Sequence, residues 1–274
     1  MDNSIGIVVL NFKVYEETKR CVSSIRRVTA QCYPIVIVDN GSENGSYQHL
    51  KEYYRTWDRI DVIENHKNKG FAKGNNYGIH YLKNRYHTKF VILLNSDTLV
   101  EDKYYFEKLL RKYKKGVGVI EANIRNGRGD FVQPVQENVS VWANGYRLLQ
   151  AFCKYYDIYW PFKELPVHKK YLCQIGCAIM LTPDYFDIYE GLYSHTFLYG
   201  EEQILLILLE RMGLELVFAD DTYLVHKEGR STGNAILVYS RKKEKKALKG
   251  YWNIFLASCM PTRALIKATK WREN

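Results

Sequence analysis

Four short apolar runs, each ended by polar or turn residues, alternate with helix-length stretches in the N-terminal part of the chain. The runs are Ile5–Leu10, Ile35–Val38, Asp61–Ile63 and Phe90–Leu94. Short apolar runs of this kind are typical of strands buried in a sheet, and strands that alternate with helices form parallel, right-handed units. The pattern therefore predicts an α/β fold with a doubly wound, mostly parallel sheet, in which ligands bind beyond the carboxyl ends of the strands.

The stretches between these runs carry the pattern of amphipathic helices. Apolar residues recur on one face over Tyr15–Val28 and again around Tyr77 and Leu82. From Val117 onward the alternation is less regular. The elements expected there are a glycine-rich turn over 126–129, an aromatic, loop-prone stretch over 152–162, a strand over Tyr171–Leu181, a helix over Glu201–Met212 and a short final strand over Thr222–His226.

The positive charge is concentrated in the C-terminal tail. The formal net charge of the chain is +10, and Arg241–Asn274 holds ten Lys or Arg against two Glu, which is +8. Such asymmetry indicates an anionic partner, either nucleic acid or the negative face of a membrane. Aromatic and aliphatic residues around Trp252 and Trp271 accompany these cations. A segment of this composition can lie on an anionic membrane, or can pack on the domain with a solvated basic face.

The cysteines and the N-terminus predict a cytoplasmic protein. The six cysteines form no Cys-x-x-Cys pair of the kind that zinc and redox sites use. Met1–Ser4 does not begin a secretory signal, and the longest apolar run, Ile204–Leu209, is too short to span a bilayer.

Polar residues follow the predicted strands at the edge where a ligand is expected. Asp39 directly follows an apolar strand, so its carboxylate either accepts hydrogen bonds from a nucleoside or only bonds the backbone of a turn. The segment 68–78 holds three glycines and three asparagines. Glycines allow a ligand to approach backbone N–H groups, and a helix start favours phosphate; the alternative is an unusual helix N-terminus.

A candidate metal ligand follows the fourth strand. Asn95-Ser96-Asp97 comes directly after Phe90–Leu94. A carboxylate at a strand end can hold Mg²⁺ or Mn²⁺ against a diphosphate, although Asp97 could equally cap a turn. His226 ends the last predicted strand, and a neutral imidazole is also a ligand for such ions. Arg230 and Ser231, in the loop that follows, could hold phosphate oxygens.

Two acids, Glu201 and Glu202, begin the predicted helix Glu201–Met212. The helix dipole favours their charged forms, so a base at this position is expected to be ionised at neutral pH. Ordinary enrichment of acids in the first turn is the alternative. Successive helix residues point about 100° apart, so only one of the two is expected to face a substrate.

Taken in order, these segments resemble family 2 glycosyltransferases with the Rossmann-like GT-A fold. The similarity is greatest to bacterial rhamnosyl- and galactosyltransferases of capsule and O-antigen synthesis, and it extends from Ile5 to Thr232. The motifs that carry it are Val-Asp-Asn-Gly-Ser at 38–42, Asn-x-Gly-Phe-Ala-x-Gly-Asn-Asn-x-Gly at 68–78, Leu-Asn-Ser-Asp at 94–97, Gly-Glu-Glu at 200–202, and His226.

The resemblance implies an inverting transfer from a UDP- or dTDP-sugar with Mn²⁺ or Mg²⁺ as cofactor. It makes Asp97 and His226 the metal ligands, with Asn95 where the family commonly has a second acid. Glu202 matches the catalytic base, with Glu201 as its competitor. The residues implied to bind the nucleotide-sugar are Asn11, Phe12, Asp39, Gly70, Phe71, Gly74, Asn75, Asn95 and Ser96, together with Arg230 and Ser231.

The same resemblance divides the chain. Residues 1–235 are expected to form the catalytic domain, with a nucleotide-sugar-binding half over 1–115 and an acceptor-side half over 116–235. Residues 236–274 are expected to attach the protein to the cytoplasmic face of the membrane, where a polyprenyl-linked saccharide acceptor would be found.

Two other functions compete with this prediction. A sugar-phosphate nucleotidyltransferase would need a glycine-rich basic signature after the first strand, which Asn11–Val14 lacks. A nucleic-acid-binding protein would account for the charge but leave Asp97, Glu202 and His226 unexplained, so no nucleic-acid partner is expected.

Overall fold

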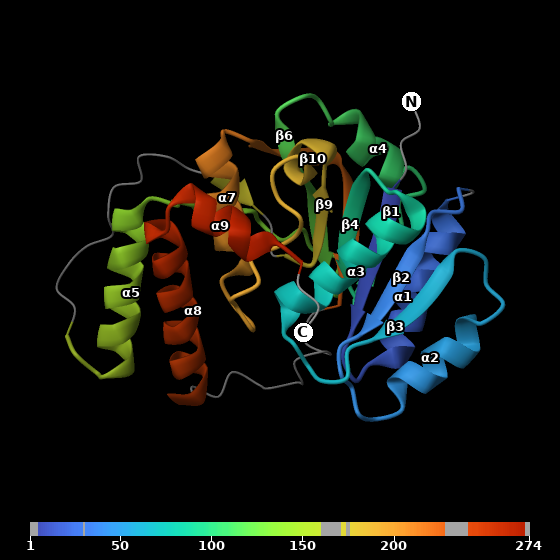
Figure 1. Cartoon of the computed structure of the whole chain (residues 1–274), viewed down its shortest axis with the longest axis horizontal. Coiled ribbons are helices and arrows are strands. Elements are labelled where there is room, and N and C mark those ends of the chain that lie inside the picture. Colours follow the sequence, from blue (N-terminus) through green and yellow to red (C-terminus); the bar gives the residue numbers. More distant parts are fainter. Residues whose placement is uncertain (1–4, 30, 160–170, 174–175, 228–240, 272–274) are drawn as a thin grey trace.

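The computed structural model describes residues 5–29, 31–159, 171–173, 176–227 and 241–271. Its centre is an eight-stranded sheet (Figure 1). The described strands, of which β7 and β8 form a separate small sheet, are β1 (Ile5–Asn11), β2 (Ile35–Asp39), β3 (Ile60–Glu64), β4 (Phe90–Asn95), β5 (Thr98–Leu99), β6 (Val117–Asn126), β7 (Val135–Glu137), β8 (Tyr171–Cys173), β9 (Ala178–Leu181) and β10 (Glu215–His226). The helices are α1 (Tyr15–Val28), α2 (Ser46–Tyr54), α3 (Phe71–Tyr86), α4 (Tyr105–Arg111), α5 (Val141–Tyr155), α6 (Pro183–Phe186), α7 (Glu201–Met212), α8 (Arg241–Cys259) and α9 (Thr262–Thr269).

The sheet is mixed, with the strand order β3-β2-β1-β4-β9-β6-β10-β5. The four predicted N-terminal strands form its parallel half, and β6 and β10 are also parallel to each other. β9 runs antiparallel between β4 and β6, and β5 runs antiparallel to β10. The α/β class and the mostly parallel sheet predicted from the sequence are therefore confirmed.

Three predicted elements in the second half were wrong. The single strand expected over Tyr171–Leu181 is two strands: β8 pairs with β7 in a separate sheet, and β9 lies in the main sheet. The expected short strand over Thr222–His226 is the end of the longer β10, whose register shifts between Ala219 and Tyr223. Polar residues at the bulge interrupt the apolar pattern of β10, so the sequence pattern did not predict the half of the strand that precedes the bulge. The stretch over 152–162, expected to be a loop, begins inside α5.

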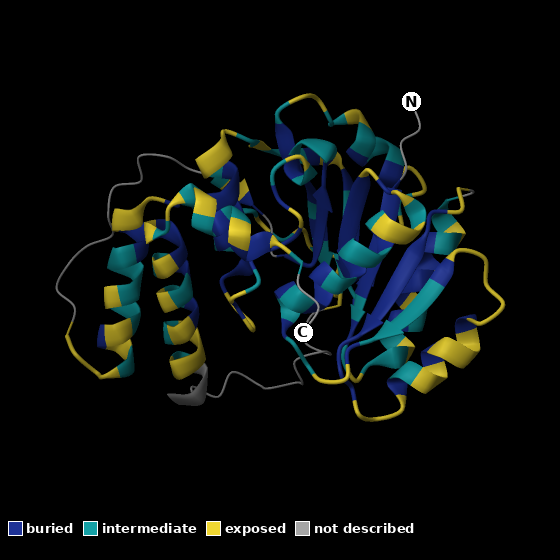
Figure 2. Cartoon of the chain, viewed as in Figure 1, coloured by how far each residue is buried: buried dark blue, intermediate teal, exposed yellow. Residues whose placement is uncertain are grey.

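Each face of the sheet has its own hydrophobic core because alternate strand residues point to opposite sides. Ile7 and Val9 of β1 pack with α1, α2 and α4. Val8 packs on the other side with α3, α6 and α7. The result is a three-layer α/β/α arrangement whose central strands are buried along almost their whole length (Figure 2).

The C-terminal tail is largely helical and packs on the second core. Ile254 and Ala257 of α8 and Leu265 of α9 are buried there. α8 also packs along α5 (Figure 1), where a Cβ on Gly145 would lie 3.3 Å from the ring of Phe255. In the part of the chain that the structure describes, every helix is too short or too polar to cross a membrane.

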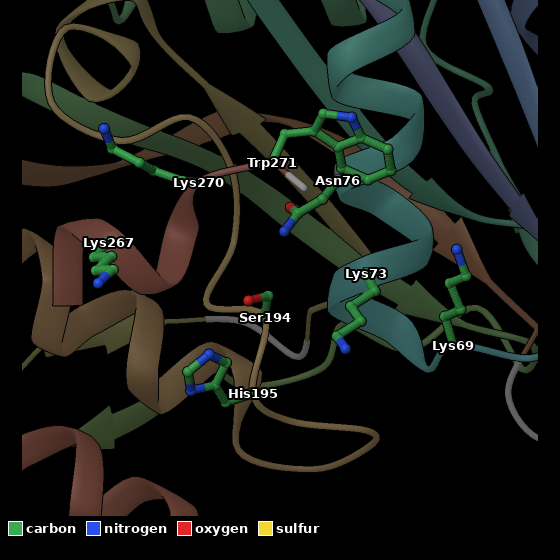
Figure 3. Close-up of a pocket in the computed structure, with 8 residues that line it drawn as sticks. All are labelled: Lys69, Lys73, Asn76, Ser194, His195, Lys267, Lys270 and Trp271. Carbon is green, nitrogen blue, oxygen red and sulfur yellow. The ribbon is translucent and has the colours of Figure 1, made fainter. Parts of the chain in front are cut away.

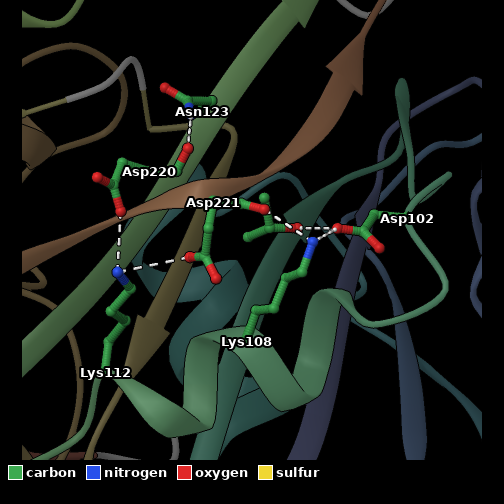
Figure 4. Close-up of polar contacts among 7 residues, drawn as sticks. Asp102, Lys108, Lys112, Asn123, Asp220 and Asp221 are labelled. Atoms are coloured by element: carbon green, nitrogen blue, oxygen red, sulfur yellow. Dashed lines mark hydrogen bonds and ion pairs between the residues drawn. The ribbon is translucent and has the colours of Figure 1, made fainter.

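A polar network holds the bulge of β10 against α4 (Figure 4). The ammonium of Lys108 and the hydroxyl of Thr222 both donate to Oδ2 of Asp102, each at 2.7 Å, and Lys112 donates to Asp220 at 2.8 Å. Burial opposes the charge of Asp102, but the hydrogen bonds from Lys108, Tyr104 and Thr222 lower its pKa below the usual value. The network therefore fixes the position of the strand that ends in His226.

Candidate active site

Asp97 and His226 lie side by side beyond the carboxyl end of β4. The Nε2 atom of His226 is 3.3 Å from Oδ1 of Asp97. Asp97 is 5% exposed, and its Oδ1 has no well-formed hydrogen bond to any described residue. A buried carboxylate oxygen without a donor is unfavourable unless a cation or a proton satisfies it. A cation bound at this oxygen would remove that cost.

Strand pairing brings the two residues together. His226 pairs with Thr98 in the antiparallel ladder of β10 and β5, and the Lys227 N–H donates to the carbonyl of Asp97 at 3.0 Å. The turn that carries Asp97 is closed by a 2.7 Å hydrogen bond from the Thr98 hydroxyl to the carbonyl of Asn95. The pairing of β10 with β5 thus places the imidazole of His226 beside the carboxylate of Asp97.

The pair fits part of a site for a divalent cation. Mn²⁺ and Mg²⁺ favour carboxylate oxygens, and Mn²⁺ also accepts imidazole. The described residues contain no group of three or more His, Cys, Asp or Glu side chains that could hold an ion. A cation bound by Asp97 and His226 would therefore take its remaining ligands from water and a bound diphosphate.

The ends of β1 and β2 form a second polar cluster. The Asn11 amide donates to Oδ2 of Asp39 at 2.6 Å, and the N–H and hydroxyl of Ser42 donate to the same carboxylate at 3.0 and 2.7 Å. Asp39 is 1% exposed, so it makes the turn contacts that were the alternative to nucleoside binding. Phe12, which follows Asn11, is half-buried.

Asn40 is a residue of this region that the sequence interpretation missed. Its Nδ2 donates to the carbonyl of Gly70 at 3.0 Å and to the side chain of Asn68 at 3.2 Å, while its Oδ1 accepts from Asn65 at 3.0 Å. These bonds tie the loop before α3 to the end of β2. The only sequence signal was its place directly after Asp39 in a strand-end turn.

The glycines of 68–78 were predicted to let a ligand approach the backbone, and in the structure other atoms of the protein lie close to them. A Cβ on Gly74 would lie 2.7 Å from a methyl of Leu10, and one on Gly78 would lie 2.5 Å from a methyl of Val8. Their spacing of four residues makes a stripe along α3 that packs directly on β1.

The start of α3 is attached to the loop that precedes α7. Gly70 has φ of 84°, and a Cβ there would lie 2.3 Å from the carbonyl oxygen of Phe197. The Phe71 N–H donates to that same oxygen at 3.0 Å. Asn75 is buried and donates to the carbonyl of Phe71 at 3.0 Å. The loop segment assigned to the donor therefore also contacts the acceptor-side loop.

Glu202 lies on the side of α7 that faces the end of β4. A Cβ on Gly176 would come 2.6 Å from Oε1 of Glu202, and the carbonyl of the next residue, Cys177, accepts the N–H of Asn95 at 2.9 Å. Burial, and then the charges of Asp97 and Glu202, raise the pKa of Cys177 well above its usual range.

Glu201 has different surroundings. It is 9% exposed, and burial, assisted by the charge of Glu202, raises its pKa to about 7 despite the lowering effect of Thr196 and Tyr199. At pH 7 it is only about half ionised. For Glu201, desolvation outweighs the helix dipole that was expected to keep an acid at this position charged.

Arg230 and Ser231, the predicted phosphate-binding residues, lie outside the described residues.

A sequence profile identifies the protein at the level of a family. The profile of glycosyl transferase family 2 matches residues 4–164, more than half of the chain. The chain belongs to this family. Membership confirms the resemblance that the ordered motifs indicated.

The curated relatives it matches are distant and longer. The glycosyltransferase GlyA of Streptococcus pneumoniae is 28% identical over 159 residues, which cover 53% of this chain and 22% of GlyA. The low-salt glycan biosynthesis hexosyltransferase Agl10 of Haloferax volcanii is 26% identical over 208 residues, covering 74% of this chain and 60% of Agl10. The chain therefore spans less than two thirds of the length of either protein.

Solved structures show the same fold. GalNAc-T7, crystallised with UDP, GalNAc and Mn²⁺, superimposes with a TM-score of 0.62 at 15% identity, over 92% of this chain and 50% of that one. TarS of S. aureus, residues 1–349, superimposes with a TM-score of 0.54 at 13% identity, over 93% and 72% of the two chains. The fold is therefore of the GT-A type, as the resemblance implied.

Proposed function

We propose that this family 2 glycosyltransferase is metal-dependent and inverting, and that it transfers a sugar from a UDP- or dTDP-sugar to a polyprenyl-diphosphate-linked saccharide in bacterial cell-surface polysaccharide synthesis. The observation that carries the proposal is the contact of Asp97 with His226 at the carboxyl end of β4. Support comes from the Mn²⁺ and UDP of the GalNAc-T7 structure and from the hexosyltransferase activity in the name of Agl10.

Asp97 and His226 would hold Mn²⁺ or Mg²⁺, which would neutralise the charge of the departing nucleoside diphosphate. The buried cluster of Asn11 and Asp39 would form the floor against which the nucleoside rests, with Phe12 at its edge. Asn95 and Ser96 begin the turn that carries Asp97, so they would line the sugar side of the same pocket.

Glu202 is the proposed base. It would take the proton of an acceptor hydroxyl as that oxygen attacks the anomeric carbon from the side opposite the diphosphate, which inverts the configuration without a covalent intermediate. Its position towards Gly176 and the end of β4 supports this role. Glu201 remains the competitor, with a buried carboxyl that would help to hold the loop before α7.

Membrane attachment is also proposed, through the paired helices α5 and α8. Trp142 is 88% exposed, Tyr159, which lies beyond the end of α5, 85%, and Trp252 on α8 51%. Lys245 and Lys249 of α8 are exposed as well. Exposed aromatic residues beside lysines suit the interface of an anionic leaflet. α5 was not included in the sequence prediction, which placed the contact in the tail alone.

The tests separate donor binding from chemistry. Thermal shift with UDP- and dTDP-sugars is expected to show stabilisation that requires Mn²⁺ or Mg²⁺ and disappears in Asp97→Asn. Glu202→Gln is expected to keep donor binding but to lose about 10²-fold or more in transfer, whereas Glu201→Gln retains most of it. Near-normal transfer by Glu202→Gln, with loss in Glu201→Gln, would reverse the assignment of the base. Absence of any donor-dependent shift would refute the proposed donor class.

A further inference from the structure

A cavity of about 160 Å³ lies between the start of α3, the loop before α7 and the end of α9 (Figure 3). Neither Asp97 nor His226 is among the residues that line it. The predicted mechanism does not use it, although Lys69, Lys73 and Asn76 of its lining belong to the 68–78 motif. The residues that line it are Lys69, Lys73, Asn76, Ser194, His195, Lys267, Lys270 and Trp271.

The lining is strongly positive and contains no acidic residue. Four lysines contribute to it, and within the described ranges none of the four forms an ion pair. Lysine side chains gathered near one cavity repel one another, so an anion that binds between Lys73 and Lys267 gains attraction and relieves that repulsion. The first turn of α3 adds the positive end of a helix and holds no acid of its own.

Hydrogen bonds and ring stacking hold several of the residues that line the cavity in place. The backbone N–H and the hydroxyl of Ser194 donate to the carbonyl of Ala268 in α9, at 3.1 and 2.7 Å. The Asn76 side chain exchanges two hydrogen bonds with the backbone of Leu192. The Trp271 ring stacks on Tyr77, with centroids 5.5 Å apart and planes 6° apart.

A short loop connects the cavity to the start of α7, the helix that carries the proposed base, Glu202. Ser194 and His195 line it, and Thr196, the next residue, lies beside Glu201 and influences its pKa. Figure 3 shows Lys73 directed towards Ser194 and His195, with Lys267 beyond them on α9. An acceptor whose hydroxyl reaches Glu202 could therefore place a more distant charged group in this cavity.

We propose that the cavity binds the diphosphate of a lipid-linked acceptor, separately from the diphosphate of the donor. This inference rests on the proposed function for the identity of the ligand, but the anion site itself can be tested without any transfer reaction. Lysine ammonium groups suit phosphate oxygens, and several charge-assisted contacts are needed to hold a diphosphate in a site that is open to water.

The binding test uses inorganic pyrophosphate and the full chain labelled with 5-fluorotryptophan, with EDTA present to remove any cation from Asp97. The chain has five tryptophans, and Trp271→Phe assigns the fluorine signal of the ring in the cavity. The expected result is a saturable shift of that signal, with the dissociation constant raised about tenfold for each lysine changed in Lys73→Gln and Lys267→Gln. Lys51→Gln/Lys115→Gln removes the same charge at two exposed positions elsewhere and is the control.

The second test asks which molecule supplies the anion. Transfer is measured to a diphosphate-linked acceptor and to the same saccharide on a neutral alkyl chain. Lys73→Gln/Lys267→Gln is expected to raise KM at least tenfold for the first and to leave the second unchanged. Equal KM changes for both acceptors, or no Trp271 shift with pyrophosphate, would overturn the proposal. Binding that occurs only with vesicles containing anionic lipid would replace the acceptor by a lipid headgroup, while pyrophosphate binding without any transferase activity would refute the proposed function and leave the anion site intact.

Discussion

The buried carboxyl of Glu201 makes the stability of this protein depend on pH in an unusual direction. Its pKa rises from 4.5 to about 7 on folding, chiefly because burial disfavours the charged form. Between these values the folded protein keeps a proton that the unfolded chain has released. Stability linked to Glu201 is therefore present at low pH and decreases as the pH rises through this window.

The magnitude follows from the size of the shift. A change from 4.5 to about 7 corresponds to about 3 kcal/mol, at about 1.4 kcal/mol for each pH unit. The Gln side chain of Glu201→Gln has nearly the same shape as Glu and is neutral at every pH. The variant therefore lacks the cost of a buried carboxyl that resists ionisation. We expect the variant to match the wild type at pH 5 to within about 1 kcal/mol and to be more stable by about 3 kcal/mol at pH 9.

Urea unfolding at several values between pH 5 and pH 9 measures this difference directly. Glu202→Gln, one position along the same helix, makes the same chemical change on a half-buried side chain and is the matched control. The quantity of interest is the difference in unfolding free energy between the two variants at each pH. If Glu201→Gln changed stability by the same amount at every pH, the carboxyl would not be desolvated in the way that the structure indicates.

Three further predictions concern packing, the α4 network and the metal pair. Gly78→Ala places a Cβ 2.5 Å from a methyl of Val8 and is expected to lower the free energy of unfolding by about 1–3 kcal/mol in chemical denaturation. Gly127→Ala, where the nearest atom is 4.0 Å away, is the control and should be tolerated. Equal losses of stability in the two variants would contradict the packing role of the glycine stripe on α3. Asp102→Asn should lower the melting temperature at pH 7, with the deficit shrinking below pH 4, because a lowered pKa stabilises above the unfolded value and that contribution is lost as the pH falls. Asp97→Asn should weaken Mn²⁺-dependent donor binding at least tenfold by calorimetry, and unchanged affinity would exclude it as a ligand.

The N-terminal half of the fold could be predicted from the sequence because its signals are local. The strands β1, β2 and β4 are apolar until they end in polar residues, and the bounds of all four strands of the parallel half were predicted to within one residue. The helices over Tyr15–Val28 and Glu201–Met212 were predicted with the bounds that the structure has. The division between β8 and β9 was not, because the turn at Gly176 lies between two apolar segments and no change of composition marks it.

The candidate site shows the same division between local and distant information. The sequence by itself placed Asp39, Asp97 and Glu202 next to strand or helix ends, since polar residues at those positions follow from the apolar pattern. Which of them meet depends on strand order and burial, which no local pattern encodes. The resemblance paired His226 with Asp97, but only the tertiary structure showed how the pairing of β5 with β10 brings them together and that Glu201 is buried enough to hold a proton near neutral pH.

The basic tail gives the clearest example. Its charge and aromatic content were evident from the sequence and predicted an anionic partner. Only the tertiary structure showed that one face of α8 and α9 is part of the second core, and that Lys267 and Lys270 join Lys69 and Lys73 around one cavity. Net charge is a sum over residues, whereas a binding site requires those charges to converge. These residues are brought to one cavity by the contact of Ala268 in α9 with Ser194 in the loop before α7 and by the stacking of Trp271, just beyond α9, on Tyr77 of α3.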